Sequence, residues 1–321
     1  MRYVVIGAGA VGGVIGGRLF EHGHDVIFVA RGENYRVLAS SGLRLESPQG
    51  TAILKVPVVE SPRAVQYLSN DVVIIATKSQ DSVAPLRQLA SSAPDSVAVV
   101  CAQNGVENER VSLRLFAHTY AMCVMCPSAH ITPGVVQLHA GPSGGVFDLG
   151  RWPGGVDDTA REVAQDLENS NLHSRADDEI ALLKWGKLMS NLFNSVEAIC
   201  GGASGASELG RLLNEEAHAV LTAAGIDVTA AEAVAAKRAS IVNYQPIDGH
   251  HRGGGSSWQS LARGVGDIET DYLNGEVVLL GRLHGVATPV NELLQRRANQ
   301  MAQQHQPPGS LSEAALLAEL L

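Results

Sequence analysis

Aromatic residues and positive charge are both scarce in this chain of 321 residues. Phe, Trp and Tyr make up only 4% of the sequence, whereas small and aliphatic residues are abundant, with 34 glycines among them. This composition favours closely packed helices and buried parallel strands. The formal net charge is −9 and no long basic run occurs, which argues against a nucleic-acid-binding surface. We therefore expect no nucleic-acid partner.

Cysteine is also rare, and this bears on redox state and metal binding. The four cysteines are Cys101, Cys123, Cys126 and Cys200. Cys123 and Cys126 have the C-x-x-C spacing of a metal or redox pair, but no second pair accompanies them. His250 and His251 likewise lack further ligands nearby. We interpret the cysteines as buried thiols in a reducing, cytoplasmic protein, and we expect no metal site.

Long apolar runs are absent as well. No stretch is long enough to cross a bilayer, and an apolar strand begins directly after the first residues. We therefore expect neither a leader peptide nor a membrane partner. The tail over residues 311–321 has the pattern of a short amphipathic helix. It would dock either on its own chain or on the second subunit of a homodimer.

What the chain does have is a glycine-rich turn near its start. The apolar run 3–6 leads directly into Gly7-Ala8-Gly9-Ala10-Val11-Gly12, and a helical pattern follows. A strand, a tight glycine turn and a helix N-terminus together form a site for a dinucleotide pyrophosphate. The first glycine permits the turn, the second lets the phosphates approach, and the third lets the helix pack on the strand. The alternative is an ordinary strand-to-helix turn that is rich in glycine.

The second strand, expected over residues 24–30, indicates which dinucleotide is bound. An NAD-preferring site usually has an acidic residue at the tip of this strand, where it binds the ribose hydroxyls. Here the strand ends without one, and Arg31 follows directly. A guanidinium suits the 2′-phosphate of NADP(H) by its charge and its two-pronged geometry. We predict NADP(H) as the cofactor and Arg31 as its phosphate clamp. The alternative is a surface arginine in a loop.

Strand and helix patterns alternate through the first half of the chain, which predicts a doubly wound α/β sheet with right-handed crossovers. Strands are expected over residues 43–45, 51–59, 71–77, 96–101, 121–125, 134–139 and 146–149, with a helix over 82–91. The last three strands are expected to complete the one sheet, with some antiparallel members. From residue 157 the pattern is mostly helical, with helices expected over 159–167, 178–199, 208–224, 229–242, 257–284 and 289–302. We predict a Rossmann domain over residues 1–176 and a helical domain over 177–321. A polar, glycine-rich loop at 243–256 is expected to be mobile.

A dinucleotide-binding half needs a second surface that holds a substrate against the nicotinamide. The helix expected around residue 190 offers Lys187, Asn191 and Asn194, whose i, i+4, i+7 spacing puts them on one face. A cation near a carbonyl oxygen stabilises a developing alkoxide and delivers a proton. Lys184, one turn earlier, is the competing candidate. The alternative is that Lys187 reaches solvent and the two asparagines bond to backbone.

Taken in order, these motifs resemble the ketopantoate reductase family (2-dehydropantoate 2-reductases) over roughly residues 1–300. The resemblance rests on the glycine turn, Arg31, and residues 72–78 (VVIIATK), 103–106 (QNGV), 133–136 (PGVV), 185–191 (WGKLMSN), 256–259 (SSWQ) and 269–275 (ETDYLNG). Lys-x-x-x-Asn followed by Glu-x-Asp-Tyr-x-Asn-Gly, after a Rossmann half, is a specific combination.

The resemblance implies a fold, a reaction and a set of roles. The fold is a Rossmann domain plus an all-helical domain like the C-terminal domain of 6-phosphogluconate dehydrogenase, with the site in the cleft between them. The reaction is the NADPH-dependent reduction of 2-dehydropantoate to (R)-pantoate, in pantothenate and coenzyme A biosynthesis. Lys187 would donate the proton, and Glu269 would orient the lysine and the substrate hydroxyl. The implied substrate ligands are Asn104, Lys187, Asn191, Asn194, Ser257 and Glu269, and the cofactor ligands are Gly7, Ala8, Gly9, Ala10, Val11, Gly12, Arg31, Lys78 and Asn104.

Two departures from the family pattern bear on the substrate. Where the family usually has Asn-Pro, this chain has Asn194-Ser195-Val196, which puts the role of Asn194 in doubt. The stretch after Ser257 carries a bulky Trp258 and lacks an aspartate, which indicates a changed pocket or a changed domain contact. Arg252, in the preceding loop, could meet a substrate carboxylate. A reductase of another small 2-oxoacid or ketone, and a non-catalytic NADP-binding sensor, are therefore the alternatives.

Overall fold

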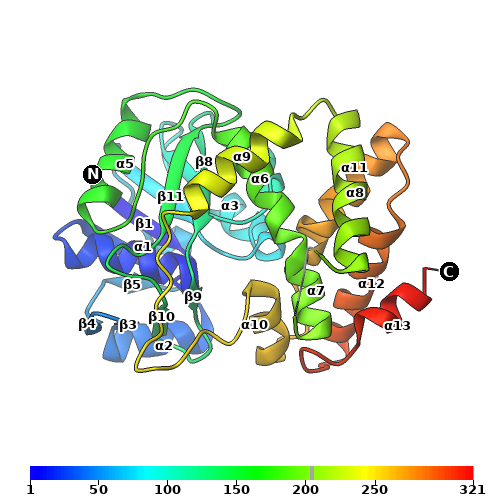
Figure 1. The fold of residues 1–321 in the computed structure, drawn as a ribbon. Coiled ribbons are helices and arrows are strands. Elements are labelled where there is room, and N and C mark those ends of the chain that lie inside the picture. The colour runs from blue at the N-terminus through cyan, green and yellow to red at the C-terminus, as the bar shows by residue number, and fades with distance from the viewer. Residues whose placement is uncertain (203–205, 321) are drawn as a thin grey trace. The chain divides into compact units, whose positions relative to one another are not determined.

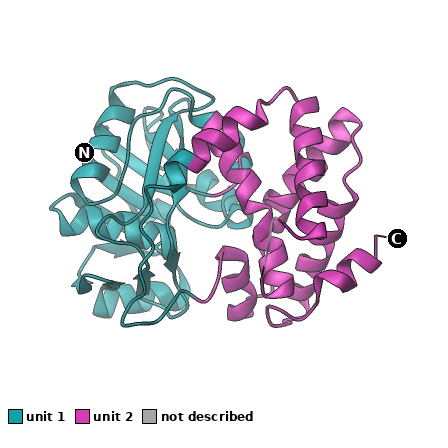
Figure 2. Ribbon diagram, viewed as in Figure 1, with its two compact units in different colours: residues 1–103, 107–181, 237–252 teal, residues 104–106, 182–236, 253–321 magenta. Residues whose placement is uncertain are grey.

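The computed structural model describes residues 1–202 and 206–320, and the chain forms two compact units (Figures 1 and 2). Unit 1 comprises residues 1–103, 107–181 and 237–252, and unit 2 comprises residues 104–106, 182–236 and 253–321. The sequence predicts a single boundary, between a domain over 1–176 and a domain over 177–321. The two units are not divided in this way, because each includes one segment from the other half of the chain. The segments are 104–106 and 237–252.

Unit 1 is built on a seven-stranded sheet with the order β5-β2-β1-β6-β7-β8-β11. The strands are β1 (Arg2–Ile6), β2 (Asp25–Val29), β5 (Val58–Val59), β6 (Asp71–Ile75), β7 (Ala98–Cys101), β8 (Thr119–Met125) and β11 (Val146–Arg151). The first six are parallel and follow the 3-2-1-4-5-6 order of a Rossmann sheet, whereas β11 pairs antiparallel with β8. The predicted doubly wound α/β class is confirmed.

Helices cover both faces of this sheet (Figure 1). The α1 helix (Ala10–Glu21) and the α5 helix (Asp158–Asn169) pack on the face that presents Tyr3 and Val5. The α3 helix (Val83–Ala90) packs on the face that presents Val4 and Ile6. Alternate residues of β1 therefore enter two separate cores, which explains why residues 3–6 of the strand are all apolar. The remaining helical elements are α2 (Gly32–Ser41), η1 (Pro62–Ala64), η2 (Ser79–Asp81) and α4 (Glu107–Leu113).

Four of the strands form a second sheet, which corrects the expectation of a single one. They are β3 (Leu43–Ser47), β4 (Gly50–Leu54), β9 (Ser128–Ala129) and β10 (Val135–Leu138), in the order β4-β3-β10-β9. The α1 helix lies between the two sheets. A Cβ on Gly16 would come 2.4 Å from the Phe28 ring of β2, and one on Gly13 would come 2.7 Å from Val136 of β10. The glycines of α1 thus let both sheets approach one helix closely.

The polar segment 237–252 is held on unit 1 by specific contacts. Arg238 forms a two-pronged ion pair with Asp148 of β11, whose carboxylate is fully buried. Asn243 and Gly141 exchange two hydrogen bonds, of 2.7 Å from Asn243 Nδ2 and 3.1 Å from the Gly141 N–H. The Gln245 N–H donates to the carbonyl oxygen of His139. The first residues of the loop expected at 243–256 are therefore paired along the end of β10.

We expect Arg238→Met to lower the free energy of unfolding by about 3–5 kcal/mol, because it leaves a buried carboxylate without its principal cation. The more distant Arg175, at 3.6 Å, would be left to face Asp148. Urea unfolding measures the change. The control is Arg161→Met, which breaks an exposed pair with Asp158 of 2.8 Å and should cost much less stability. Equal losses in the two variants would contradict a structural role for the buried pair.

Unit 2 consists of helices around one apolar core. They are α6 (Ile180–Asn191), α7 (Phe193–Cys200), α8 (Glu208–Ala223), α9 (Val228–Ala239), α10 (Ser256–Arg263), η3 (Glu269–Tyr272), α11 (Asn274–His284), α12 (Pro289–Gln303) and α13 (Glu313–Ala318), with the start of α6 and the end of α9 in unit 1. The predicted helical class of this half is confirmed. Two predicted helices are divided, since a turn at Leu192 separates α6 from α7 and residues 264–273 separate α10 from α11.

The C-terminal helix α13 docks on its own chain, because Leu316 is fully buried in the core of unit 2. Within residues 1–202 and 206–320, no single helix has the length and apolar character needed to cross a membrane. The α8 and α9 helices meet that criterion only when taken together, by length and composition, and the chain bends by 119° between them.

Candidate functional site

The glycine turn has the geometry expected of a dinucleotide site. Gly7 has φ +101°, and a Cβ there would lie 2.7 Å from the Thr77 backbone nitrogen. A Cβ on Gly12 would lie 2.1 Å from the Gly7 carbonyl oxygen, so only glycine lets α1 begin this close to β1. At Gly9 the nearest atom that a Cβ would meet is His130 Cδ2, at 3.9 Å. The turn is therefore closed at Gly7 and Gly12 but open at Gly9, where a pyrophosphate would approach.

Asn34 of α2 braces this turn, although no sequence motif marks it. Its Nδ2 donates to the Ala8 carbonyl oxygen at 3.0 Å, and its Oδ1 accepts from the Gly134 N–H at 2.8 Å. Ala8 belongs to the glycine turn and Gly134 directly precedes β10. Asn34 thus ties the turn to the second sheet. Gly134 is part of a motif that carried the family resemblance, and this contact gives that motif a structural reason.

Arg31 directly precedes α2 and is 79% exposed. Its Nη2 donates to Asp81 Oδ1 at 2.7 Å. Asp81 ends η2, the short turn that follows β6. The residue predicted to clamp a 2′-phosphate therefore contacts a carboxylate that sequence reasoning missed.

Hydrogen bonds also join the loops that follow β6 and β7, around the predicted cofactor ligand Lys78. Ser82 Oγ donates to the Lys78 carbonyl oxygen at 2.9 Å and lies 3.0 Å from Thr77 Oγ1. Gln103 Nε2, after β7, donates to the same Ser82 oxygen at 2.7 Å. These contacts fix the backbone of Lys78 beside Thr77, the residue against which Gly7 packs.

Two of the predicted substrate ligands, Asn191 and Ser257, are buried polar side chains of unit 2. Asn191 ends α6 and is 5% exposed, and Ser257 lies fully buried in the first turn of α10. Within the described part of the chain, Asn191 Oδ1 and Ser257 Oγ have no hydrogen-bond partner. A buried polar atom without a partner is costly and rare, so each of these two needs an explanation. A ligand that supplies the missing hydrogen bonds is such an explanation.

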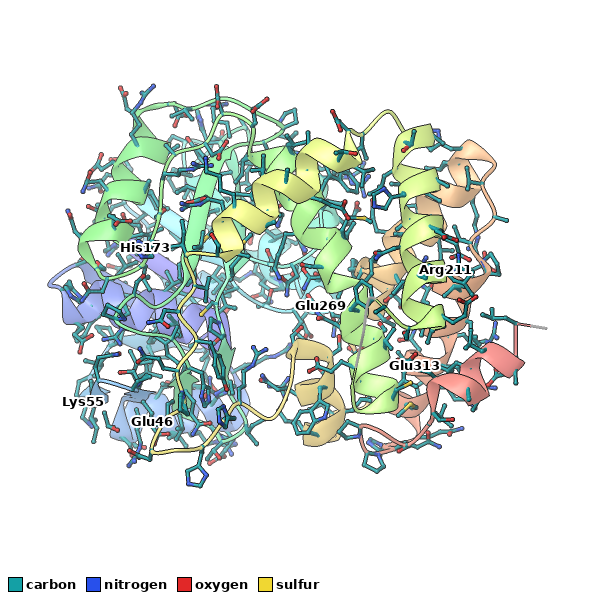
Figure 3. The ribbon with its side chains drawn as sticks, viewed as in Figure 1. Glu46, Lys55, His173, Arg211, Glu269 and Glu313 are labelled. Atoms are coloured by element: carbon teal, nitrogen blue, oxygen red, sulfur yellow. The ribbon has the colours of Figure 1, made fainter. Side chains whose placement is uncertain are left out.

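Glu269 begins η3 and is only 4% exposed; Figure 3 labels its side chain. The loop that carries Asn104 lies against the same turn. Gly105 has φ +76°, and a Cβ there would lie 2.7 Å from the Tyr272 carbonyl oxygen. The structure therefore brings the segments of Asn104 and Glu269 together, although they are far apart in the sequence.

A buried hydrogen-bond network holds η3 against the turn between α6 and α7. Ser195 Oγ donates to Asn274 Oδ1 at 2.6 Å and lies 3.0 Å from Thr270 Oγ1. Asn274 Nδ2 donates to the Leu192 carbonyl oxygen at 3.3 Å, at the break between the helices. Thr270 follows Glu269 in the chain. The network therefore fixes the position of Glu269 relative to the end of α6, the helix that carries Lys187.

The two candidate lysines differ in burial. Lys187 is half-buried, and its Nζ donates to Ser190 Oγ at 3.4 Å. Lys184 is only 3% exposed. Lys187 and Asn191 lie one turn apart on α6, as predicted. This pair therefore presents a cation and an amide from the same face of one helix.

Asn194 lies beyond the turn at Leu192, so the predicted continuous face of three polar residues is interrupted. Its Nδ2 lies 3.5 Å from Ser256 Oγ, at the start of α10. Glu197 Oε2, also on α7, accepts from the Gly255 N–H at 3.0 Å. These two α7 residues anchor the first turn of α10, the turn that carries Ser257.

Trp258 and the glycine run before it form one feature. A Cβ on Gly253 would lie 2.9 Å from the indole, and one on Gly254 would lie 2.5 Å from Trp258 Cγ. The ring therefore packs directly on backbone that only glycine provides. The glycine run therefore leaves the space that the bulky Trp258 side chain occupies.

Three stacked aromatic rings on unit 1 hold part of the loop at 243–256 in place. Tyr244 stacks on His139 and on His251, with ring centroids 6.0 Å and 5.9 Å apart. Burial, together with the charges of Arg252 and His251, lowers the pKa of His139. Burial raises the pKa of the nearby Cys126 thiol to about 11, so this thiol is protonated at neutral pH.

Within residues 1–202 and 206–320, no group of three or more His, Cys, Asp or Glu side chains is arranged to hold a metal ion.

Two family models match most of the chain. The model described as Ketopantoate reductase PanE/ApbA matches residues 3–154, and the model of the C-terminal part of the same family matches residues 179–302. The chain belongs to the ketopantoate reductase family. The resemblance inferred from the motifs is therefore confirmed, and both units contain matched residues.

Relatives and solved structures agree with this membership. The chain is 28% identical over 302 residues to the 2-dehydropantoate 2-reductase of Archaeoglobus fulgidus, a match that covers 91% of this chain and 95% of that protein. The enzyme of the same name from Halobacterium salinarum is 28% identical over 300 residues, with 90% and 95% covered. A ketopantoate reductase structure from Ralstonia eutropha matches with a TM-score of 0.79 at 27% identity, covering 95% and 100% of the two chains.

A D-mandelate dehydrogenase solved with NADH and anilino(oxo)acetate is also similar in fold. Its TM-score is 0.81 at 24% identity, with 95% of this chain and 99% of that chain covered. The fold of ketopantoate reductases is therefore shared with a dehydrogenase of a different name.

Proposed function

We propose that this chain reduces 2-dehydropantoate to (R)-pantoate with NADPH, as a step of pantothenate and coenzyme A biosynthesis. The observation that carries the proposal is that two buried oxygens, Asn191 Oδ1 and Ser257 Oγ, have no hydrogen-bond partner among the residues that the structure describes. 2-Dehydropantoate offers a hydroxyl, a ketone and a carboxylate. An amide oxygen accepts a hydrogen bond from the hydroxyl, and a serine hydroxyl donates one to the carboxylate or the ketone. The names of the relatives that are 28% identical support the same substrate.

The cofactor that we propose would be held by the glycine turn and Arg31. The open approach at Gly9, at the N-terminus of α1, fits the pyrophosphate of a dinucleotide. The exposed guanidinium of Arg31 fits a 2′-phosphate. The D-mandelate dehydrogenase solved with NADH supports a nicotinamide dinucleotide in this fold. When bound, such a cofactor supplies the hydride.

Lys187 is the proton donor of this proposal. As the ketone is reduced, negative charge grows on its oxygen, and an ammonium group stabilises that charge and protonates the oxygen. The buried carboxylate of Glu269 would attract and orient the ammonium group of Lys187. The network through Thr270 and Asn274 would keep that carboxylate in place.

We expect Arg31→Ala to weaken NADPH binding by about ten- to a hundredfold, the equivalent of one charge-assisted hydrogen bond, and to leave NADH binding nearly unchanged. The reason is that only NADPH carries the 2′-phosphate. Fluorescence titration of the purified protein with each nucleotide measures both dissociation constants. The control is Arg36→Ala, which removes an exposed arginine within α2 that is paired with Glu33. Equal losses for the two nucleotides in Arg31→Ala would show that Arg31 is not the clamp.

A second candidate is a reductase of another small 2-oxoacid, favoured by Trp258 next to Ser257 and by the D-mandelate dehydrogenase neighbour. The hydroxyl-free analogue 3,3-dimethyl-2-oxobutanoate separates the two functions, because it would leave Asn191 Oδ1 unsatisfied. The first proposal predicts a kcat/KM for 2-dehydropantoate at least about tenfold above that for the analogue, since an unpaired buried acceptor costs about 1–3 kcal/mol. A higher value for the analogue, or for benzoylformate, would favour the second candidate.

A further inference from the structure

We propose that Asp81 is a cofactor-specificity residue, which accepts a hydrogen bond from the ribose 2′-hydroxyl of NADH and opposes the 2′-phosphate of NADPH. The inference rests on the proposed function, because it takes Arg31 as the group that meets the 2′-phosphate. It goes beyond the proposed function because it assigns to Asp81 an effect on nucleotide preference opposite to that of Arg31. The expected result is a pocket that admits both nucleotides.

The sheet topology explains why these two side chains meet. The β1 strand pairs in parallel with β2 on one side and with β6 on the other. The carboxyl ends of all three strands therefore lie on one edge of the sheet. The glycine turn follows β1, Arg31 follows β2 and η2, with Asp81, follows β6. The tip of β2 has no acidic residue, but Asp81, after the neighbouring strand β6, places a carboxylate beside Arg31.

The contact itself leaves room for a ligand. Arg31 Nη2 donates to Asp81 Oδ1 at 2.7 Å, through a single nitrogen of the guanidinium. Arg31 is 79% exposed and Asp81 is 40% exposed, so neither side chain is locked by packing. A guanidinium has five N–H donors in a planar fork, so a phosphate can bind on its remaining edge.

A phosphate on that guanidinium would lie close to the Asp81 carboxylate. Like charges at such a site repel, and the repulsion reduces what Arg31 contributes to NADPH binding. A 2′-hydroxyl at the same place is instead a hydrogen-bond donor, which a carboxylate accepts well. The Asp81 side chain therefore favours NADH and disfavours NADPH, while Arg31 favours NADPH.

The test measures the affinities of NADPH and NADH for the full chain by calorimetry, with no turnover required. Asp81→Asn keeps the shape and removes the charge, and it should tighten NADPH about three- to fivefold, the range of an exposed charge pair. Asp81→Ala also removes the acceptor, and it should weaken NADH by about the same factor. The matched control is Asp158→Asn, which removes the carboxylate of another exposed arginine pair on unit 1. It should change neither dissociation constant.

Two outcomes would overturn the proposal. Weaker NADPH binding in Asp81→Asn would mean that Asp81 holds Arg31 in place for the phosphate. Unchanged constants for both nucleotides would mean that Asp81 does not face the ribose. A failure of the proposed reaction is seen separately, as nucleotide binding without reduction of 2-dehydropantoate. A failure of the clamp is seen in Arg31→Ala, and the role of Asp81 would fall with it.

Discussion

Lys187→Ala should lower kcat by about 10²–10⁴-fold, the usual contribution of a positioned general acid, while NADPH affinity stays within a few-fold. The physical reason is that the alkoxide formed by reduction loses both its counter-charge and its proton source. Lys187 belongs to unit 2, and the glycine turn and Arg31 belong to unit 1, so nucleotide binding is not expected to depend on it. Steady-state kinetics and a nucleotide titration on the same preparation separate the two quantities.

The competing lysine on the same helix provides the control. Lys184→Met removes a cation that is almost fully buried, one turn before Lys187. If Lys187 is the proton donor, this variant keeps much more activity than Lys187→Ala, and any loss accompanies lower stability in a thermal melt. Full loss of turnover in Lys184→Met, with activity retained in Lys187→Ala, would identify Lys184 as the donor instead.

Gly9→Ala should weaken both NADPH and NADH by about ten- to a hundredfold, the equivalent of the 1–3 kcal/mol cost of overpacking. The added methyl group would project into the space that a pyrophosphate needs. It meets no atom of the chain closer than 3.9 Å, so the fold should tolerate it. Calorimetric titration with each nucleotide measures the loss, and urea unfolding should show little change in stability.

Gly12→Ala is the comparison variant, because its effect on nucleotide binding should come with damage to the fold. Its Cβ would overlap the Gly7 carbonyl oxygen, so this variant should lose stability as well as nucleotide affinity. Normal nucleotide affinity in a well-folded Gly9→Ala protein would contradict the placement of the pyrophosphate at this turn.

Much of unit 1 could be predicted because its signals are local. The glycine turn, the apolar strand β6 and the strand-helix alternation each lie within a short stretch of sequence. The second sheet could not be predicted in this way. Its central pair joins Arg44–Glu46 of β3 to residues 135–137 of β10, and a parallel pairing between segments so far apart leaves no local pattern.

The same distinction applies to the candidate site. Lys187 and Asn191 could be predicted to share a face because one helix carries both. The contact between Arg31 and Asp81 could not, since it depends on which strands become neighbours of β1. In the sequence, Ser195 marks only a departure from the family pattern, because its place in the buried network depends on the packing of three separate elements.

The most direct test of the central claim follows NADPH absorbance after 2-dehydropantoate is added to the purified protein, and identifies the product by chiral chromatography. Our account predicts loss of the reduced nicotinamide with formation of (R)-pantoate in equal amount. Tight NADPH binding with no oxidation by 2-dehydropantoate or by the other 2-oxoacids would contradict it, and would instead indicate a nucleotide-binding protein without turnover.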